Sequence, residues 1–265
     1  MTARLLSLAT GNLPEFTPVE VVNAAAEASW AACGVWFDPA TWTPQTTRET
    51  RRAFDVSGVA PFDIEVAWIK PGGHDPDHER LFAAGGEIGA RHALVVSSDP
   101  DVQATKRKFE RLCQLGERFD IDVSFEFLPI TEVKSLPAAL EIVVGVGHPR
   151  GRLLVDALHL ARSGGDPDDL IGLPPNLFAY MQICDAPAQL PAMDYATVLE
   201  EAVDGRLMPG EGALPLRRLL AALPETLPIA PEMRAKWLRE KYPAAADRAR
   251  EILESTQKFL RTLGL

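Results

Sequence analysis

The sequence is short of the residues that build membrane spans and disulfide scaffolds. No apolar run reaches the eighteen or so residues that a membrane-spanning helix needs, and the apolar part of the opening segment 1–13 is too short for a signal peptide. The three cysteines, Cys33, Cys113 and Cys184, are widely spaced and include no Cys-x-x-Cys pair, which favours free thiols in a reducing compartment. We therefore expect a cytoplasmic protein with no membrane partner.

Positive charge is also scarce. The 27 Lys and Arg residues are outnumbered by 37 Asp and Glu residues, so the formal net charge is -10 and the average field repels a nucleic-acid backbone. The chain has 265 residues, of which 46% are hydrophobic and 24% charged, which is typical of a folded globular protein and excludes a disordered one. We expect no nucleic-acid partner.

The 22 prolines punctuate helices. Many of them follow Thr or Asp directly, at Thr17-Pro18, Thr43-Pro44, Asp75-Pro76, Asp99-Pro100 and Asp166-Pro167. A Thr or Asp side chain caps the first amides of a helix, and proline fits the next position because no amide donor is needed there. These pairs therefore predict helix starts, and Thr17 and Glu20 have the spacing of a capping box.

Short runs rich in Val, Ile, Leu and aromatic residues lie between these starts and predict buried strands. They cover segments 5–10, 33–38, 64–70, 92–99, 122–129, 152–158, 178–184 and 226–233. Successive starts are about 30 residues apart, the length of one strand–helix unit, except for a longer last interval. Eight such units predict a single (β/α)8 TIM barrel domain over 1–265. A doubly wound open sheet is the alternative, but no Gly-rich phosphate loop follows the first strand.

Function in such a barrel is located at the carboxyl ends of the strands, where four consecutive predicted strands each supply an oxygen-bearing side chain. These side chains are Glu126, Asp156, Gln182 and Glu232. Converging carboxylates repel one another, and a divalent cation removes that penalty. Carboxylate, amide and water oxygens suit Mn²⁺ or Mg²⁺, while Co²⁺ and Zn²⁺ stay open. The pattern predicts a site for one divalent metal ion.

Each of these residues also has a purely structural interpretation. Glu126 is equally explained as an ion-paired acid at a strand end, and Asp156 as the cap of the next helix. Gln182 is explained as a group that hydrogen-bonds its neighbours inside the barrel, and Glu232 as a solvated loop acid. The metal hypothesis depends on the four occurring at matching ends of successive strands.

Further residues are candidates for contact with a substrate. His159 follows Asp156 by three positions and is either a surface histidine at a helix start or a donor to a substrate oxygen. Asp185 follows strand 178–184. Arg206 precedes the turn Pro209-Gly210-Glu211-Gly212 and could bind a hydroxyl, carboxylate or phosphate. Trp36, at a strand mouth, offers an aromatic face to a sugar.

The order of these motifs resembles the sugar phosphate isomerase/epimerase family of the xylose-isomerase-like TIM barrel superfamily. The matching residues are Glu126, Asp156-x-x-His159, Gln182-x-x-Asp185, Arg206-x-x-Pro209-Gly210-Glu211-Gly212 and Glu232. The resemblance implies that Glu126 and Glu232 bind the metal and exchange protons with the substrate, and that Asp156 is a third ligand. It implies that Gln182 stands where the family most often has histidine, and that His159 and Arg206 contact the substrate.

The resemblance implies a metal-dependent isomerase or epimerase that acts on a keto-sugar or related polyol through an enediolate. Two alternatives stay open: a dehydroshikimate-dehydratase-like lyase, and a ligand-binding barrel without catalysis. The apurinic-site DNA endonucleases of the superfamily use several histidines, and this chain has none after His159. The expected partner is a small carbohydrate-like molecule. A homo-oligomer stays open because dimers and tetramers are common among similar proteins.

Overall fold

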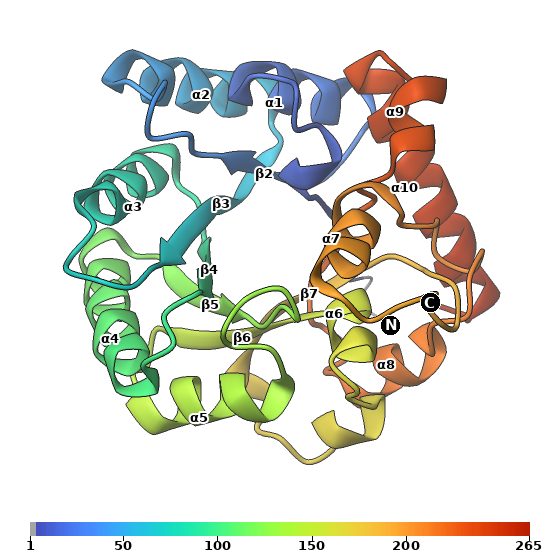
Figure 1. Ribbon diagram of the computed structural model, residues 1–265. Helices are drawn as coiled ribbons and strands as arrows, with labels where there is room; N and C mark the ends of the chain where they lie inside the picture. Colours follow the sequence, from blue (N-terminus) through green and yellow to red (C-terminus); the bar gives the residue numbers. More distant parts are fainter. Residues whose placement is uncertain (1–3) are drawn as a thin grey trace.

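Eight parallel strands form one sheet whose order follows the sequence from β1 to β8, as seen along the barrel in Figure 1. The computed structural model describes residues 4–265. The strands are β1 (Ser7–Leu8), β2 (Ala32–Trp36), β3 (Ala60–Ile69), β4 (His92–Ser97), β5 (Asp122–Glu126), β6 (Gly151–Asp156), β7 (Phe178–Ile183) and β8 (Ile229–Pro231). Leu6 pairs with Ile229 between the first and last strands and brings the sheet round into a barrel. The predicted TIM barrel is confirmed, and the open sheet is excluded.

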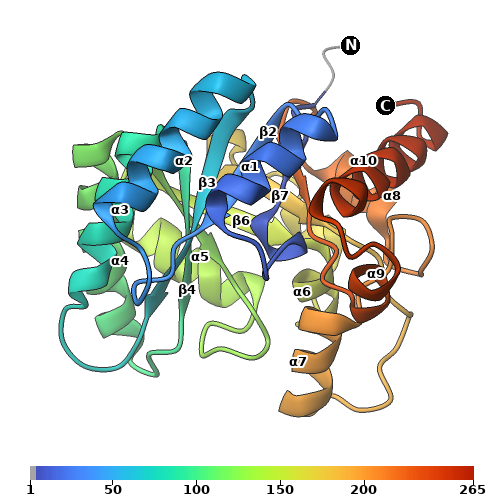
Figure 2. The ribbon, with the colours of Figure 1, turned by 90° about the horizontal axis from the view of Figure 1, so that it is seen from above.

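The helices surround the strands as an outer ring (Figure 1). They are α1 (Pro18–Glu27), α2 (Pro44–Ser57), α3 (Pro76–Ile88), α4 (Val102–Phe119), α5 (Leu136–Val146), α6 (Ala157–Arg162), α7 (Tyr195–Asp204), α8 (Leu216–Ala222), α9 (Lys236–Lys241) and α10 (Ala245–Thr262). Within residues 4–265, no helix combines the length and apolar character needed to cross a bilayer. Figure 2 shows α7 at the end of the barrel opposite the two termini.

Most of the predicted helix starts are confirmed by their capping bonds. Thr17 and Glu20 form the capping box of α1, Thr43 caps α2, and Asp75 caps α3. Asp166-Pro167 begins the short 3-10 helix η2 (Pro167–Leu170). The start predicted at Asp99 is wrong by two residues, because Asp101 caps α4 and Asp99 forms an ion pair with Lys108 (Oδ2–Nζ 2.6 Å).

The apolar interior has two parts. One packs on the outward faces of the strands and the other on their inward faces. The larger part lies between strands and helices and includes Val35, Val123 and Phe125. The smaller part fills the barrel and includes Leu154, Tyr180 and Ala230. Side chains alternate along a strand, so residues two positions after this inner set also face inward. That alternation directs Asp156, Gln182 and Glu232 into the barrel, and Glu126, between the outward-facing Phe125 and Phe127, faces inward too.

Candidate active site

The four predicted oxygen ligands lie together at the carboxyl end of the barrel. Glu126 ends β5, Asp156 ends β6, Gln182 lies in β7 and Glu232 follows β8. Asp156 and Gln182 are directly paired across β6 and β7. All four residues are buried, with no more than 7% of the surface of each residue exposed. Their gathering at one end agrees with the sequence prediction, and their role as ligands remains a hypothesis.

His159 is part of the same cluster. It lies in the first turn of α6, and its Nε2 is 4.0 Å from Oε1 of Glu126. One ligand atom each from Glu126, Asp156 and His159 lie within 4.8 Å of one another, a spacing that a metal ion can bridge. The histidine predicted to contact substrate therefore lies close enough to two acids to be a metal ligand itself.

Asp156 has the helix-capping role that the sequence left open and also contacts a buried arginine. Its Oδ1 accepts hydrogen bonds from the backbone amides of Leu158 (2.6 Å) and His159 (3.0 Å), and so caps α6. Its Oδ2 is 2.7 Å from Nη1 of Arg206. The cap fixes the carboxylate at the strand end and places His159 beside it.

Arg206 is a buried cation within this group of acids. Besides Asp156, its guanidinium contacts Glu232 (Nη2–Oε2 2.9 Å) and donates from Nε to the carbonyl of Ala202 (2.9 Å). The side chain is 2% exposed. Short antiparallel bridges, Asp185 with Leu207 and Gly205 with Ala235, hold its segment against the barrel end. Arg206 therefore forms ion pairs with two acids, and the substrate contact predicted for it stays a prediction.

Burial and neighbouring charges separate the proton affinities of these groups. Burial, with the charges of Asp156 and Glu232, raises the pKa of Glu126 well above its ordinary value. Burial also tends to raise the pKa of Asp156, but Arg206 and His159 hold it below the usual range. Burial lowers the pKa of His159 to about 4, so its imidazole is neutral at pH 7. The pKa of Glu126 is therefore raised and that of Asp156 lowered, although both acids are buried at the same barrel end.

The residues present fit a divalent cation on two grounds. The three carboxylates of Glu126, Asp156 and Glu232 face one guanidinium, so the ionised group has two uncompensated negative charges. In addition, both side-chain amide atoms of Gln182 and Nδ1 of His159 are buried without a hydrogen-bond partner among residues 4–265. Buried polar atoms are rarely left unpaired, and a cation bound by Gln182 Oε1 and the carboxylates would provide the missing interaction of Oε1.

Asp185 and Trp36 lie outside this cluster. Asp185 accepts backbone hydrogen bonds from Ala186 and Leu214 at Oδ1 and from Gly210 at Oδ2. These bonds organise the loop that contains the predicted Pro-Gly-Glu-Gly turn, and the substrate contact predicted for Asp185 remains untested. Trp36 ends β2 with 45% of its surface exposed, as expected for a residue at the strand mouth.

Sequence reasoning missed a second group of acids inside the barrel. Asp63 and Glu65 lie in the middle of β3 and are almost completely buried. The hydroxyl of Tyr180 donates to Oδ2 of Asp63 (2.8 Å). Burial raises the pKa of Asp63 to about 6 and that of Glu65 well above its ordinary value. The signal available in the sequence was an acid in alternate positions of an otherwise apolar strand.

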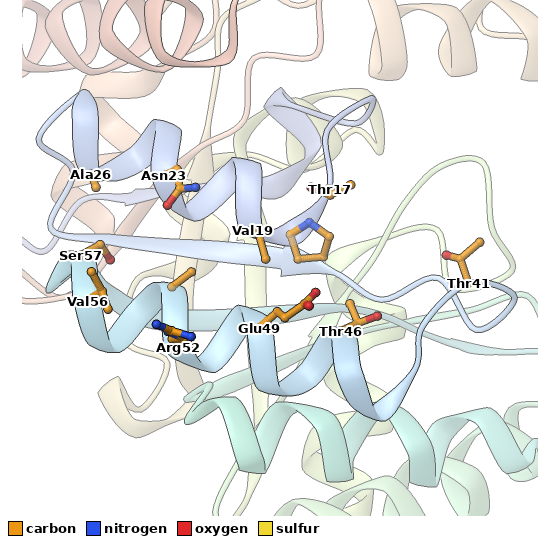
Figure 3. Close-up of a pocket in the computed structure, with 12 residues that line it drawn as sticks. Thr17, Val19, Asn23, Ala26, Thr41, Thr46, Glu49, Arg52, Val56 and Ser57 are labelled. Atoms are coloured by element: carbon orange, nitrogen blue, oxygen red, sulfur yellow. The ribbon is translucent and has the colours of Figure 1, made fainter.

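A cavity of about 870 Å³ lies elsewhere, between α1 and α2 on the outer ring (Figure 3). Its charged lining residues are Glu49 and Arg52, and it includes none of the predicted site residues. Helix surfaces rather than strand ends form it, so it is distinct from the candidate site.

Comparisons with solved structures show how widely this architecture is shared. A xylose isomerase-like TIM barrel/4-hydroxyphenylpyruvate dioxygenase fusion protein matches 96% of this chain with a TM-score of 0.81 and 21% identity, and this chain spans 42% of that protein. A structure of IOLI protein with a bound zinc atom matches with a TM-score of 0.77, 15% identity and 97% coverage of both chains.

Two further neighbours are described as enzymes with different reactions. D-allulose 3-epimerase from Methylomonas sp. in complex with D-allulose has a TM-score of 0.70 and 12% identity, covering 97% of this chain and 98% of that one. The probable 3-DHS dehydratase AsbF from Bacillus anthracis has a TM-score of 0.67 and 19% identity, covering 98% and 99%. At these identities the likeness shows the fold alone.

No curated protein matches the sequence. The family model described as xylose isomerase-like TIM barrel matches residues 22–262, nearly the whole described chain. That stretch includes seven of the eight strands and every residue of the candidate site. The chain belongs to the xylose isomerase-like TIM barrel family.

Proposed function

We propose that the protein is a divalent-metal-dependent enzyme that isomerises or epimerises a keto-sugar or related polyol. The observation that carries this proposal is a buried carboxyl of raised pKa, Glu126, 4.0 Å from the neutral imidazole of His159. A carboxylate positioned beside the substrate can act as a general base and remove the proton next to a carbonyl. The epimerase among the structural neighbours agrees with this chemistry.

Glu126, Asp156, Gln182 and Glu232 would hold the metal ion, with His159 close enough to join them. A bound divalent ion polarises a carbonyl and stabilises negative charge on its oxygen. Mn²⁺ and Mg²⁺ suit the oxygen donors, and the zinc-bound neighbour shows that this fold also accepts Zn²⁺.

The reaction would begin when Glu126 takes the proton from the carbon next to the substrate carbonyl, leaving an enediolate. His159 would hydrogen-bond to the substrate oxygen through one of its ring nitrogens. Return of the proton from Glu126 to the neighbouring carbon gives the aldose–ketose isomer. Delivery of a proton to the original carbon from the opposite face would give the epimer. Glu232 would take that proton from solvent and pass it on, and the proton left on Glu126 would return to solvent.

The experiment measures incorporation of deuterium from D₂O into D-fructose, D-allulose and D-tagatose by NMR, using Mn²⁺-loaded protein. We expect exchange with wild type and a loss of at least about a hundredfold with Glu126→Gln, since a general base contributes about 10²–10⁴-fold. Glu49→Gln, on the outer ring, is the matched control and should keep full exchange. Exchange that survives in Glu126→Gln would refute the role of Glu126.

The pairing of Glu232 with Arg206 favours a second candidate, a dehydratase. Because Glu232 is held by a permanent cation, proton transfer on the Glu126 side alone is sufficient for an elimination. In that reaction Glu126 would take the α-proton and pass it to the β-hydroxyl, which would leave as water. The probable dehydratase among the neighbours has the same fold. Incubation with 3-dehydroshikimate would give an absorbing aromatic product for a dehydratase and none for an isomerase.

A further inference from the structure

The groove between α1 and α2 is an exposed surface that the candidate site does not use. It is the cavity of about 870 Å³ shown in Figure 3, and both helices line it along their length. Its apolar lining residues are Pro18, Val19, Ala26, Ala53 and Val56. Val56 is 80% exposed, the highest value for a large apolar residue in the chain from residue 4 onward. A contiguous apolar surface left in water commonly marks a contact with another protein.

Two opposite charges in this groove lack a partner of opposite charge. Glu49 and Arg52 lie three positions apart on α2, and neither forms an ion pair with another residue of the described range 4–265. Oε1 of Glu49 accepts a hydrogen bond from Nε2 of Gln45 (2.6 Å) on the same helix. By contrast, the neighbouring Arg51 is paired with Asp55 (2.9 Å). The groove therefore offers one carboxylate and one guanidinium to whatever binds there.

The local charge favours contact between two copies of this chain. The formal net charge is -10, so the average field of one copy repels another. Helix α2 is an exception, because its three arginines outnumber its two acids, Glu49 and Asp55. Helix α1 is acidic, with Glu20 and Glu27 and no basic residue. A contact that places α2 of one copy against α1 and α2 of the other brings opposite charges together.

A two-fold axis would use both unpaired charges at once. When α2 of one copy runs antiparallel to α2 of the other, pairing Glu49 with Arg52 of the second copy also pairs Arg52 with Glu49 of the second copy. This register places Val56 opposite the turn of α2 that contains Thr46 in the other copy. Thr46 lines the same groove as Val19, which points from α1 towards α2 (Figure 3). The exposed valine of each copy thereby enters the groove of the other, as a ridge packs into a groove between helices.

We propose that the groove between α1 and α2 binds a second copy of this chain, in a two-fold symmetric dimer in which Glu49 and Arg52 pair reciprocally and Val56 packs into the opposite groove. Two helices from each copy make a contact at the small end of specific interfaces, so we expect a dissociation constant of about 10 µM. None of the candidate site residues lines the groove, so both barrel mouths stay open and the dimer does not depend on the proposed reaction.

Sedimentation of the wild type from about 1 to 100 µM tests the proposal. The mass should rise with concentration from 28.9 kDa, the mass of one chain, towards twice that value. Glu49→Arg and Arg52→Glu each bring like charges together across the axis, and each should weaken the dimer by at least about tenfold. A wild type that keeps the mass of one chain at the highest concentration would overturn the proposal.

Exchange of charges distinguishes this interface from any other. A mixture of the Glu49→Arg and Arg52→Glu proteins should form a mixed dimer, because a groove with two cations then faces a groove with two anions. The double variant Glu49→Arg/Arg52→Glu should recover the dimer by itself, because the reciprocal pairs form again in reverse. If the wild type is a dimer and neither combination associates, the reciprocal pairing is refuted.

Further variants test the apolar contact and the specificity of the charge effect. Val56→Asp should weaken the dimer by at least about tenfold, because a carboxylate would have to enter an apolar groove. Arg107→Glu, which reverses an exposed charge on α4 outside the groove, is the control and should leave the dimer intact. A dimer that persists unchanged in Glu49→Arg, Arg52→Glu and Val56→Asp would place the contact on another surface and overturn the proposal.

Discussion

In the proposed metal site, Gln182 is the residue that would set the affinity for a cation. Its amide lies in β7 opposite Asp156, and both polar atoms lack a hydrogen-bond partner in the described chain. An amide oxygen is a neutral, weak ligand, whereas an imidazole nitrogen binds Zn²⁺ more strongly. The position therefore keeps the site accessible to harder ions such as Mn²⁺ and Mg²⁺.

Replacing Gln182 by His should raise the affinity for Zn²⁺ by about tenfold, and Gln182→Leu should lower it, because one strengthens a ligand and the other removes it. Competition with a coloured chelator measures both affinities. If Gln182→Leu binds Zn²⁺ as tightly as wild type, Gln182 is not a ligand.

His92 makes stability depend on pH. It begins β4 inside the barrel, between the rings of Phe62 and Tyr180 at 5.0 and 5.2 Å. Burial lowers its pKa to about 3 from the ordinary 6.5. Between these values the unfolded chain binds the proton and the folded chain does not, so stability is fully present above pH 6.5 and falls as the pH drops towards 3.

The variant His92→Phe fits among the same rings and has no proton to bind. Its free energy of unfolding should depend less on pH than that of wild type, by up to about 1.4 kcal/mol per pH unit below 6.5. Urea titrations at pH 7, 6 and 5 measure the difference. The contribution of His159 to the pH dependence is the same in both proteins and therefore does not affect this difference. Identical pH slopes would contradict the prediction.

At the scale of elements, the loop after β1 fastens the first strand to the last. The turn η1 (Thr10–Asn12) places Asn12 beside β8, where its Nδ2 donates to the carbonyls of Ala9 (2.9 Å) and Pro231 (2.8 Å). Its Oδ1 accepts from the amide of Met233. The adjacent Gly11 leaves no room for a side chain, since an added Cβ would overlap Oε1 of Glu232. This contact locates Glu232 as well as closing the barrel.

Asn12→Ala should lower the free energy of unfolding by about 2–4 kcal/mol, because it removes the side-chain hydrogen bonds to the Pro231 carbonyl and the Met233 amide. It should also weaken metal binding, since Glu232 lies between two of the groups that lose their bond. Asn23→Ala, exposed on α1, is the matched control. Chemical denaturation and metal titration provide the two measurements, and an Asn12→Ala protein as stable as the Asn23→Ala control would contradict this role.

Local patterns predicted the elements well because strands and capped helices are specified by neighbouring residues. All eight strands and the starts of α1, α2 and α3 follow from apolar runs and Thr-Pro or Asp-Pro pairs. The start of α4 could not be predicted in this way, because Asp99 and Asp101 flank Pro100 and either could cap the helix. Asp99 instead forms an ion pair with Lys108, and Asp101 is the cap.

Sequence patterns could predict only those residues of the candidate site that lie at the ends of strands. Glu126, Asp156, Gln182 and Glu232 were identified from their position alone. The partners of Arg206 were not, because Asp156 is 50 residues away along the chain and no local pattern records such a contact. Asp63 and Glu65 were missed because they lie within a strand rather than at its end.

For the molecule as a whole, a bound cation should stabilise the folded state. The proposed cation would bind only the assembled barrel end, to which β5, β6, β7 and β8 each contribute. A ligand at 100 times its dissociation constant stabilises the folded state by about 2.7 kcal/mol. The acids would otherwise repel one another.

Removing divalent ions with chelator should therefore lower the melting temperature of the metal-loaded protein by about 5–10 °C. Asp156→Asn should show a much smaller difference between the loaded and stripped states, whatever its own stability. Calorimetric or fluorescence melting curves measure both. An equal shift in wild type and Asp156→Asn would place the stabilising ion elsewhere on the protein.

The position of Arg206 in the chain has a consequence for synthesis on the ribosome. The acids of β3, β5 and β6 emerge before the guanidinium that neutralises Asp156, and Glu232 emerges later still. A nascent chain that ends before residue 206 has a concentration of negative charge on its inward faces and no strand to close against β1. Ribosome-bound fragments ending at residue 200 should therefore stay sensitive to protease, and protection should appear only once β8 has left the exit tunnel.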